Sequence, residues 1–162
     1  MNPVNIELSE RIRNELPDIE YALQRALQIW PKAKIAAADQ DIYLSAIALN
    51  LHGFYSGLER LFELIARHID RTAPTGENWH RDLLQQIARD VPNVRPAVLD
   101  SDSALALDEF RRFRHLVRNI YTMNLVPSRM ALLIEAAPDL WPTVKAELLA
   151  FADFLADLGL SD

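Results

Sequence analysis

The amino-acid sequence predicts an all-α protein, an antiparallel up-and-down bundle of about five helices joined by short connections. Three observations support this fold class. Apolar residues recur at helical spacing over long segments, whereas no segment alternates apolar and polar residues as a half-buried strand does. No Asn-Gly or Asp-Gly turn separates two β-branched runs. The chain also has only four glycines, which suits a protein with few tight turns.

The composition fits one helical domain spanning residues 1–162. A chain of 162 residues, half of them apolar, can bury a core of useful size. The absence of cysteine excludes disulfides, thiolate zinc sites and a cysteine nucleophile. The net charge of −6 argues against broad, non-specific binding of nucleic acid, but it leaves room for a small basic site. Early acidic residues and the lack of a long apolar run predict a cytoplasmic protein without a signal peptide or a membrane span.

The first helix is expected from about Glu7 to Trp30. Pro17 falls inside this segment, and a proline removes one helical hydrogen bond, so we expect a kink or a break near Leu16. Pro31 follows directly and is expected to end the helix.

The second helix is expected to be the longest, from about Asp39 to Arg71. Its core stripe falls within an arc of about 100° and comprises Ile47, Leu51, Phe54, Leu58, Leu61, Phe62, Ile65 and Ile69. Gly53 and Gly57 lie one turn apart on another face. Because a glycine weakens a helix by roughly 0.5–1 kcal/mol, this pair indicates close contact with another helix, within the protomer or across a dimer.

Two shorter elements precede the fourth helix. A loop is expected over residues 72–78, which include a proline and a glycine. A third helix is expected over Trp79–Asp90, with His80 capping or stacking at its start. Residues 91–97 contain two prolines and are expected to be extended or irregular.

The last helix is expected from Pro127, which suits a first helical turn, to about Leu158. Pro138 and Pro142 should bend it. Gly159 is expected to cap its C-terminal end.

The stretch Leu107–Asn124, LDEFRRFRHLVRNIYTMN, forms most of the fourth helix, which Ser101, Asp102 or Ser103 is expected to cap. At about 100° per residue, its apolar side comprises Phe110, Phe113, Leu116, Val117 and Ile120. Its polar side comprises Arg111, Arg114, His115, Arg118, Asn119, Tyr121 and Thr122. Four arginines lie within eight residues, and no Asp or Glu occurs from Phe110 to Pro127. Like charges on one helix face repel by roughly 0.2–0.5 kcal/mol per pair, so we expect carboxylates elsewhere in the fold, or a phosphate, to balance this face.

This stretch resembles the motif of the HEPN superfamily, most closely that of the HepT-like ribonuclease toxins. Their signature is an arginine, a polar residue, three residues, a histidine, one residue and a tyrosine. On this chain the arginine is Arg114, the polar residue is His115 and the tyrosine is Tyr121, whereas Asn119 occupies the position of the usual catalytic histidine. Segments 51–66, 77–84 and 113–121 together resemble one branch of these proteins, so the resemblance covers nearly the whole chain.

The resemblance implies the toxin component of a toxin–antitoxin system, a metal-independent endoribonuclease that needs no cofactor. It implies a homodimer through the motif helix, so that two motif helices line a shared cleft. It also implies a cognate nucleotidyltransferase antitoxin of the MNT type, which can adenylylate Tyr121 and silence the site.

The chemistry of these residues suits such an activity. Arginine offers a planar, permanently charged fork to phosphate oxygens. Arg114 is the candidate for stabilising the phosphate, and Arg111 and Arg118 are candidates for substrate binding. His115 is the candidate base, because histidine is the usual proton-transfer group near neutral pH. Asn119 cannot move a proton, but it could position the substrate.

Other readings of the same residues remain open. No pair of histidines has metal-ligand spacing, so no metal site is expected. Asn119 favours a non-catalytic HEPN binding module that docks a nucleotidyltransferase and helps bind nucleotide or substrate. A structural dimerisation bundle would instead pair the arginines with acidic residues inside the protein. Tyr121 could equally be a half-buried tyrosine at the margin of the core.

Overall fold

The chain forms five α-helices in a computed structural model that describes residues 1–118 and 125–161, without the side chain of Arg118. The helices are α1 (Pro3–Ile35), α2 (Gln40–His68), α3 (Trp79–Ile87), α4 (Ser101–Arg118) and α5 (Pro127–Ser161). No strand occurs in the residues that are described. The predicted all-α helical bundle is therefore confirmed.

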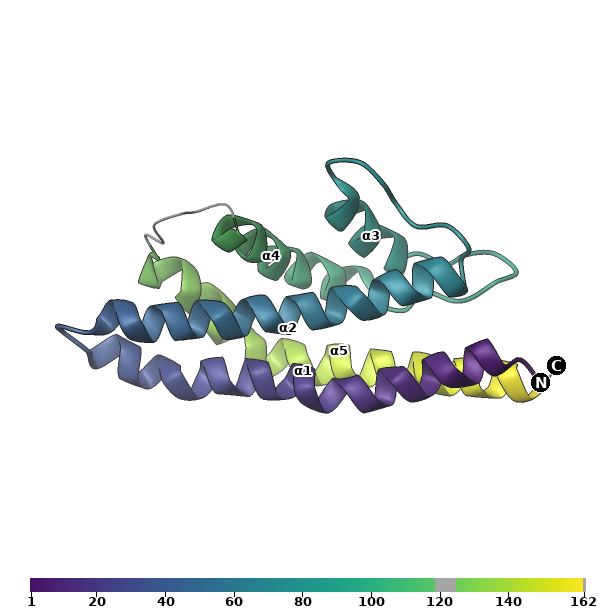
Figure 1. Cartoon of the computed structure of the whole chain (residues 1–162), viewed down its shortest axis with the longest axis horizontal. Coiled ribbons are helices and arrows are strands. Elements are labelled where there is room, and N and C mark those ends of the chain that lie inside the picture. Colours follow the sequence, from purple (N-terminus) through teal and green to yellow (C-terminus); the bar gives the residue numbers. More distant parts are fainter. Residues whose placement is uncertain (119–124, 162) are drawn as a thin grey trace.

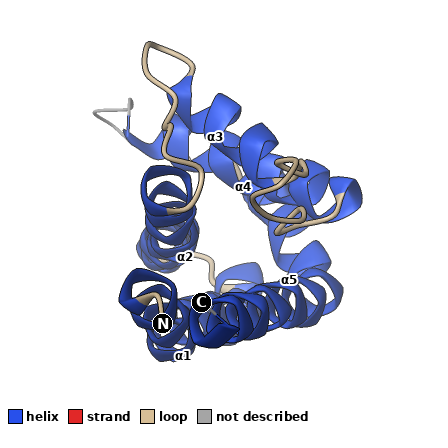
Figure 2. Cartoon of the chain, turned by 90° about the vertical axis from the view of Figure 1, so that its right-hand side faces the viewer, coloured by secondary structure: helices blue, strands red, loops and turns tan. Residues whose placement is uncertain are grey.

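Four of the helices form a ring in which each packs against two neighbours. α1 contacts α2 and α5, and α4 contacts the same two helices from the other side (Figure 2). α3 packs on the outside of this ring, against α2 and α4 (Figure 1). In the core, Phe54 of α2 meets Phe110 of α4 and Trp141 of α5 edge to face, with ring centroids 5.4 and 5.5 Å apart. These three rings pack α2, α4 and α5 against one another in the core.

The prolines do not interrupt α1, which is longer than the sequence predicts. Pro17 and Pro31 both lie inside one continuous helix, so the expected break near Leu16 and the expected end at Pro31 are wrong. Both prolines are exposed, while Leu16, Trp30 and neighbouring apolar residues are buried. Burial of the apolar stripe outweighs the hydrogen bonds that the two prolines remove.

The glycines of the long helices have different surroundings. A Cβ on Gly57 would lie 2.7 Å from Cγ1 of Ile19, so the predicted close helix contact is made here, between α2 and α1. A Cβ on Gly53 would meet nothing within 4 Å. Gly159 does not cap α5, because the helix continues past it to Ser161. Its carbonyl accepts a hydrogen bond from the Asn2 N–H at 2.8 Å. It permits the two ends of the described chain to meet closely.

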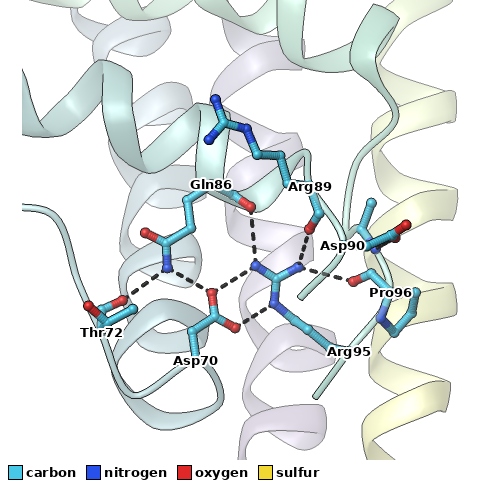
Figure 3. Close-up of polar contacts among 8 residues, drawn as sticks. Asp70, Thr72, Gln86, Arg89, Asp90, Arg95 and Pro96 are labelled. Atoms are coloured by element: carbon cyan, nitrogen blue, oxygen red, sulfur yellow. Dashed lines mark hydrogen bonds and ion pairs between the residues drawn. The ribbon is translucent and has the colours of Figure 1, made fainter. Parts of the chain in front are cut away.

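The connection between α3 and α4 is organised around the buried side chain of Arg95 (Figure 3). Its guanidinium binds both carboxylate oxygens of Asp70, at 2.6 and 2.8 Å. Its three remaining N–H groups donate to the backbone carbonyls of Gln86, Arg89 and Pro96. All five donors of the arginine are thus used. The expected irregular segment is therefore a fixed loop, and α3 ends at Ile87, before the predicted Asp90.

The start of α4 is capped by a residue that the sequence prediction did not name. The Asp100 carboxylate accepts a hydrogen bond from the Ser103 N–H at 2.7 Å, so Asp100 is the cap in place of Ser101, Asp102 or Ser103. Glu147 of α5 bonds the Asp100 N–H and the Ser103 hydroxyl. The first turn of the motif helix is therefore attached to α5.

Candidate functional site

Arg114 extends from α4 toward α2. Its Nε donates to the Ser56 hydroxyl at 2.7 Å, and its Nη1 lies 3.9 Å from Oε1 of Glu59. The side chain is 14% exposed. One of the carboxylates expected to balance the arginine face therefore comes from α2.

Glu59 links Arg114 to α3. The other carboxylate oxygen of Glu59 lies 2.8 Å from Nδ1 of His80, the second residue of α3. The imidazole of His80 stacks on the ring of Trp79, with centroids 3.6 Å apart, which confirms the expected stacking at the helix start. The Glu59 side chain is 5% exposed and the His80 side chain 20%. A nearly buried carboxylate thus holds a histidine and an arginine on its two oxygens.

Tyr55 lies one turn before Glu59 and has a buried hydroxyl. Among the described residues, this hydroxyl is the one buried side-chain polar atom without a hydrogen-bond partner. Burial raises the pKa of Tyr55 far above its usual value, and the negative charge of Glu59 raises it further. The phenol therefore stays neutral and keeps its proton to donate. We refer to Tyr55, Ser56, Glu59, His80 and Arg114 as the polar cluster.

The other arginines at the centre of α4 pair with acids of their own helix. Asp108 accepts from Nε of Arg111 at 2.6 Å and lies 2.9 Å from Nε of Arg112. Residues three and four positions apart are neighbours on a helix, so an acid just before the acid-free run still reaches into it. A purely structural role for the arginines predicts such ion pairs with acidic residues of the same chain.

His115 faces a different side of α4 from Arg114. It is exposed and lines a groove of about 680 Å³ between α4 and α5, together with Arg112 and Arg129. The floor and walls of this groove are mostly apolar and include Phe110, Phe113, Leu116, Leu132 and Leu133. The structure therefore does not bring the two adjacent residues Arg114 and His115 to one point.

Three predicted site residues cannot be placed in this geometry. Arg118 is the last residue of α4, and its side chain lies outside the description. Asn119 and Tyr121 lie outside the described residues altogether.

No candidate for a metal or membrane site emerges from the part of the chain that is described. Residues 1–118 and 125–161 contain no group of three or more His, Asp or Glu side chains placed to hold a metal ion. No helix over the same residues has the length and apolar character that a bilayer crossing needs.

Sequence reasoning singled out Arg114 and noted His80, but it missed what joins them. Glu59 falls between Leu58 and Leu61 of the core stripe, and Tyr55 lies directly after Phe54. An acid and a phenol at buried positions of an otherwise apolar helix are the signal that could have revealed the cluster. Such groups are seldom buried without partners.

The protein is thus a helical bundle in which an arginine and a histidine both contact one nearly buried carboxylate, that of Glu59. The model of the HepT-like protein family matches residues 46–155, which include all of α3 and α4 and most of α2 and α5. The chain belongs to the HepT-like family, as its motif helix predicts. A search of curated proteins and a search of solved structures each gave no match.

Proposed function

We propose that this protein is the toxin component of a toxin–antitoxin system and a metal-independent endoribonuclease. Arg114 carries the proposal. It lies on the family's motif helix, and its Nε is bound to Ser56, while Nη2 makes no hydrogen bond to a described residue. The outer edge of its guanidinium can therefore receive a phosphate in a fixed orientation. Preorganised charge of this kind stabilises the negative charge that develops on phosphate during cleavage.

The remaining predicted site residues have supporting roles in this proposal. Arg111 and Arg118 bind the substrate backbone, and Asn119 positions a phosphate or a ribose hydroxyl. His115 is the base suggested by the motif. Tyr121 is the residue at which a nucleotidyltransferase antitoxin of the MNT type would silence the toxin by adenylylation.

We further propose a homodimer through α4. The groove between α4 and α5 is apolar, and its rim carries Glu109 beside Arg112 and Arg129. A rim with both signs of charge suits a two-fold contact, in which each patch meets a copy of itself. Two copies of α4 would then lie side by side across this contact.

The first experiment is cleavage of a pool of tRNA and mRNA by the purified protein in EDTA. The wild type is expected to cut, and Arg114→Ala is expected to lose roughly 10²–10³-fold in rate, the cost of removing one preorganised donor. Arg11→Ala is the control, because it removes an arginine of α1 whose side chain is 50% exposed and lies outside both the groove and the polar cluster. A wild type that leaves all RNA intact, together with an inactive Asn119→His variant, would exclude the nuclease function.

One observation favours a second function, a non-catalytic module that docks a nucleotidyltransferase and helps bind nucleotide or substrate. Arg111, Arg112 and Arg114 each lie near a carboxylate of the protein itself, so no phosphate is needed to balance them. Growth after induction separates the two functions. Toxicity that co-expression of the neighbouring nucleotidyltransferase relieves fits the toxin, whereas harmless expression with stable binding to that enzyme fits the module.

A further inference from the structure

The motif helix lacks a histidine at the position where the family resemblance expects one, because Asn119 stands there. An RNA-cleaving site with this arginine still needs a group that takes a proton from the attacking hydroxyl. We infer that His80 of α3, oriented by Glu59 of α2, is that group. This inference rests on the proposed nuclease function and deepens it by assigning the base.

The geometry of His80 suits a base. An ionised carboxylate can only accept, so the Nδ1 that lies 2.8 Å from Glu59 carries the hydrogen and Nε2 keeps the lone pair. Nε2 makes no hydrogen bond to the described residues. Stacking on Trp79 at 3.6 Å fixes the plane of the ring. A carboxylate on one nitrogen and a lone pair on the other is the arrangement by which enzymes orient a basic imidazole.

The position of His80 relative to Arg114 also fits. Both side chains lie against Glu59, the histidine at Oε2 and the arginine at Oε1. A phosphate on the outer edge of Arg114 would therefore lie close to the imidazole. His115, in contrast, lines the groove between α4 and α5. Glu59 from α2 faces His80 directly, and Arg114 from α4 lies across that carboxylate, while the nearby Tyr55 is neutral.

The step that this assigns is internal transesterification of RNA. The 2′-oxygen forms a bond to phosphorus while its proton passes to Nε2 of His80. The bond from phosphorus to the 5′-oxygen breaks, and that oxygen takes a proton from water. The products are a 2′,3′-cyclic phosphate and a 5′-hydroxyl end, and the imidazolium then returns its proton to solvent, so no co-reactant is consumed.

The test measures RNA cleavage in EDTA by His80→Gln, with His68→Gln as the matched control on the exposed end of α2. Glutamine keeps a donor for Glu59, so the fold should be retained, and thermal melting checks this. His80→Gln is expected to lose roughly 10²–10⁴-fold in rate, the usual contribution of a general base, whereas His68→Gln should cut as the wild type does. Added imidazole is expected to restore part of the activity of His80→Ala, which a purely structural role would not allow.

The pH profile gives a second readout that needs no variant. Cleavage by the wild type should rise with pH to a plateau, because a general base acts only in its unprotonated form, and this limb should flatten in His80→Gln. A wild type without such a limb overturns the assignment. So does full activity of His80→Gln with loss of activity in His115→Gln, which would assign the base to His115.

The two variants distinguish the nuclease function from the assignment of its base. Loss of cleavage in Arg114→Ala with full activity in His80→Gln leaves the nuclease function standing and removes the base from α3. A wild type that leaves RNA intact overturns both.

Discussion

The buried hydroxyl of Tyr55 is a destabilising feature of the polar cluster. A buried hydroxyl without a partner costs about 1–3 kcal/mol, and Phe in its place would cost nothing of this kind. The described residues contain no partner for the hydroxyl, although Glu59 lies one turn away on the same helix.

We therefore predict that Tyr55→Phe raises the free energy of unfolding by about 1 kcal/mol, because it removes an unsatisfied polar group and leaves the ring in place. Denaturation in urea measures this. Tyr21→Phe, at a side chain exposed on α1, is the control and should leave the free energy of unfolding unchanged. Loss of stability in Tyr55→Phe would mean that the hydroxyl has a stabilising partner after all.

Arg95 gives the opposite expectation, since all of its donors are used. Arg95→Met should lower the free energy of unfolding by about 3–5 kcal/mol, because it leaves the buried Asp70 carboxylate without its partner. Arg89→Met is the control, because only the backbone of Arg89 takes part in this network. Urea denaturation compares the two variants, and equal small losses would show that the loop is held by its apolar contacts.

The partners of single charged residues could be predicted only in part from the sequence. It predicted that carboxylates or a phosphate would balance the arginines, because like charges cannot stay crowded on one helix face. It could not specify Glu59, since 55 residues separate it from Arg114 and only the packing of α2 against α4 brings them together. It could not locate Asp70 as the partner of Arg95 for the same reason.

At the scale of helices, α1 and α2 are in contact where Gly57 meets Ile19. Gly57→Ala gains helix propensity, but its Cβ would lie 2.7 Å from Ile19, and overpacking of this kind costs about 1–3 kcal/mol. We predict a net loss of stability of about 1 kcal/mol. Gly53→Ala is the matched control four residues earlier, where the space is open, and should gain roughly 0.5–1 kcal/mol. The melting temperature should fall in Gly57→Ala and rise in Gly53→Ala. Equal shifts in the two variants would contradict the close contact at Gly57.

α1 and α5 are joined by a polar contact at Glu20. The Trp141 indole donates to its carboxylate at 2.8 Å, and Lys145 lies 3.2 Å away. These contacts hold the pKa of Glu20 below its usual value, the Trp141 hydrogen bond most strongly and the charge of Lys145 in addition. The carboxylate is thus bound more tightly in its ionised form.

This sets the direction of a pH effect. A lowered pKa in the folded state adds stability above the unfolded value, about pH 4.3, and this stability is lost as the pH falls through the folded value. Glu20→Gln should therefore lose stability at neutral pH and depend less on pH in the acid range than the wild type. Unfolding free energies from pH 7 down to pH 3 measure this, with Glu135→Gln on the exposed side of α5 as control. Parallel pH curves for wild type and Glu20→Gln would contradict it.

Helix number and type could be predicted from apolar periodicity alone, whereas helix ends could not. Proline and glycine were expected to end α1 and α5, because each weakens an isolated helix. In the bundle, buried neighbours keep α1 continuous through two prolines, and the carbonyl of Gly159 holds the start of α1. Tertiary packing overrides local preference at these ends.

For the whole molecule, the groove between α4 and α5 predicts the oligomeric state. Leu132 is 70% exposed at this groove. The wild type is expected to be a dimer, and Leu132→Glu is expected to be a monomer, because it places a charge in an apolar contact. Tyr21→Glu is the control on α1 and should stay dimeric. Analytical ultracentrifugation over a range of concentrations decides, and a monomeric wild type would exclude this interface.

The ring of helices also has a consequence for the order of synthesis. α1 is made before α2, α3 and α4, yet one of its two neighbours in the ring is α5, which is made after them. Until the ribosome has released α5, the sides of α1 and α4 that pack against α5 stay exposed, although α2 already covers their other sides. Because these contacts form late, folding is delayed and the nascent chain is prone to aggregation. The helix that bears Arg114 therefore gains its final support only when α5 emerges, so a half-made chain should lack a finished core.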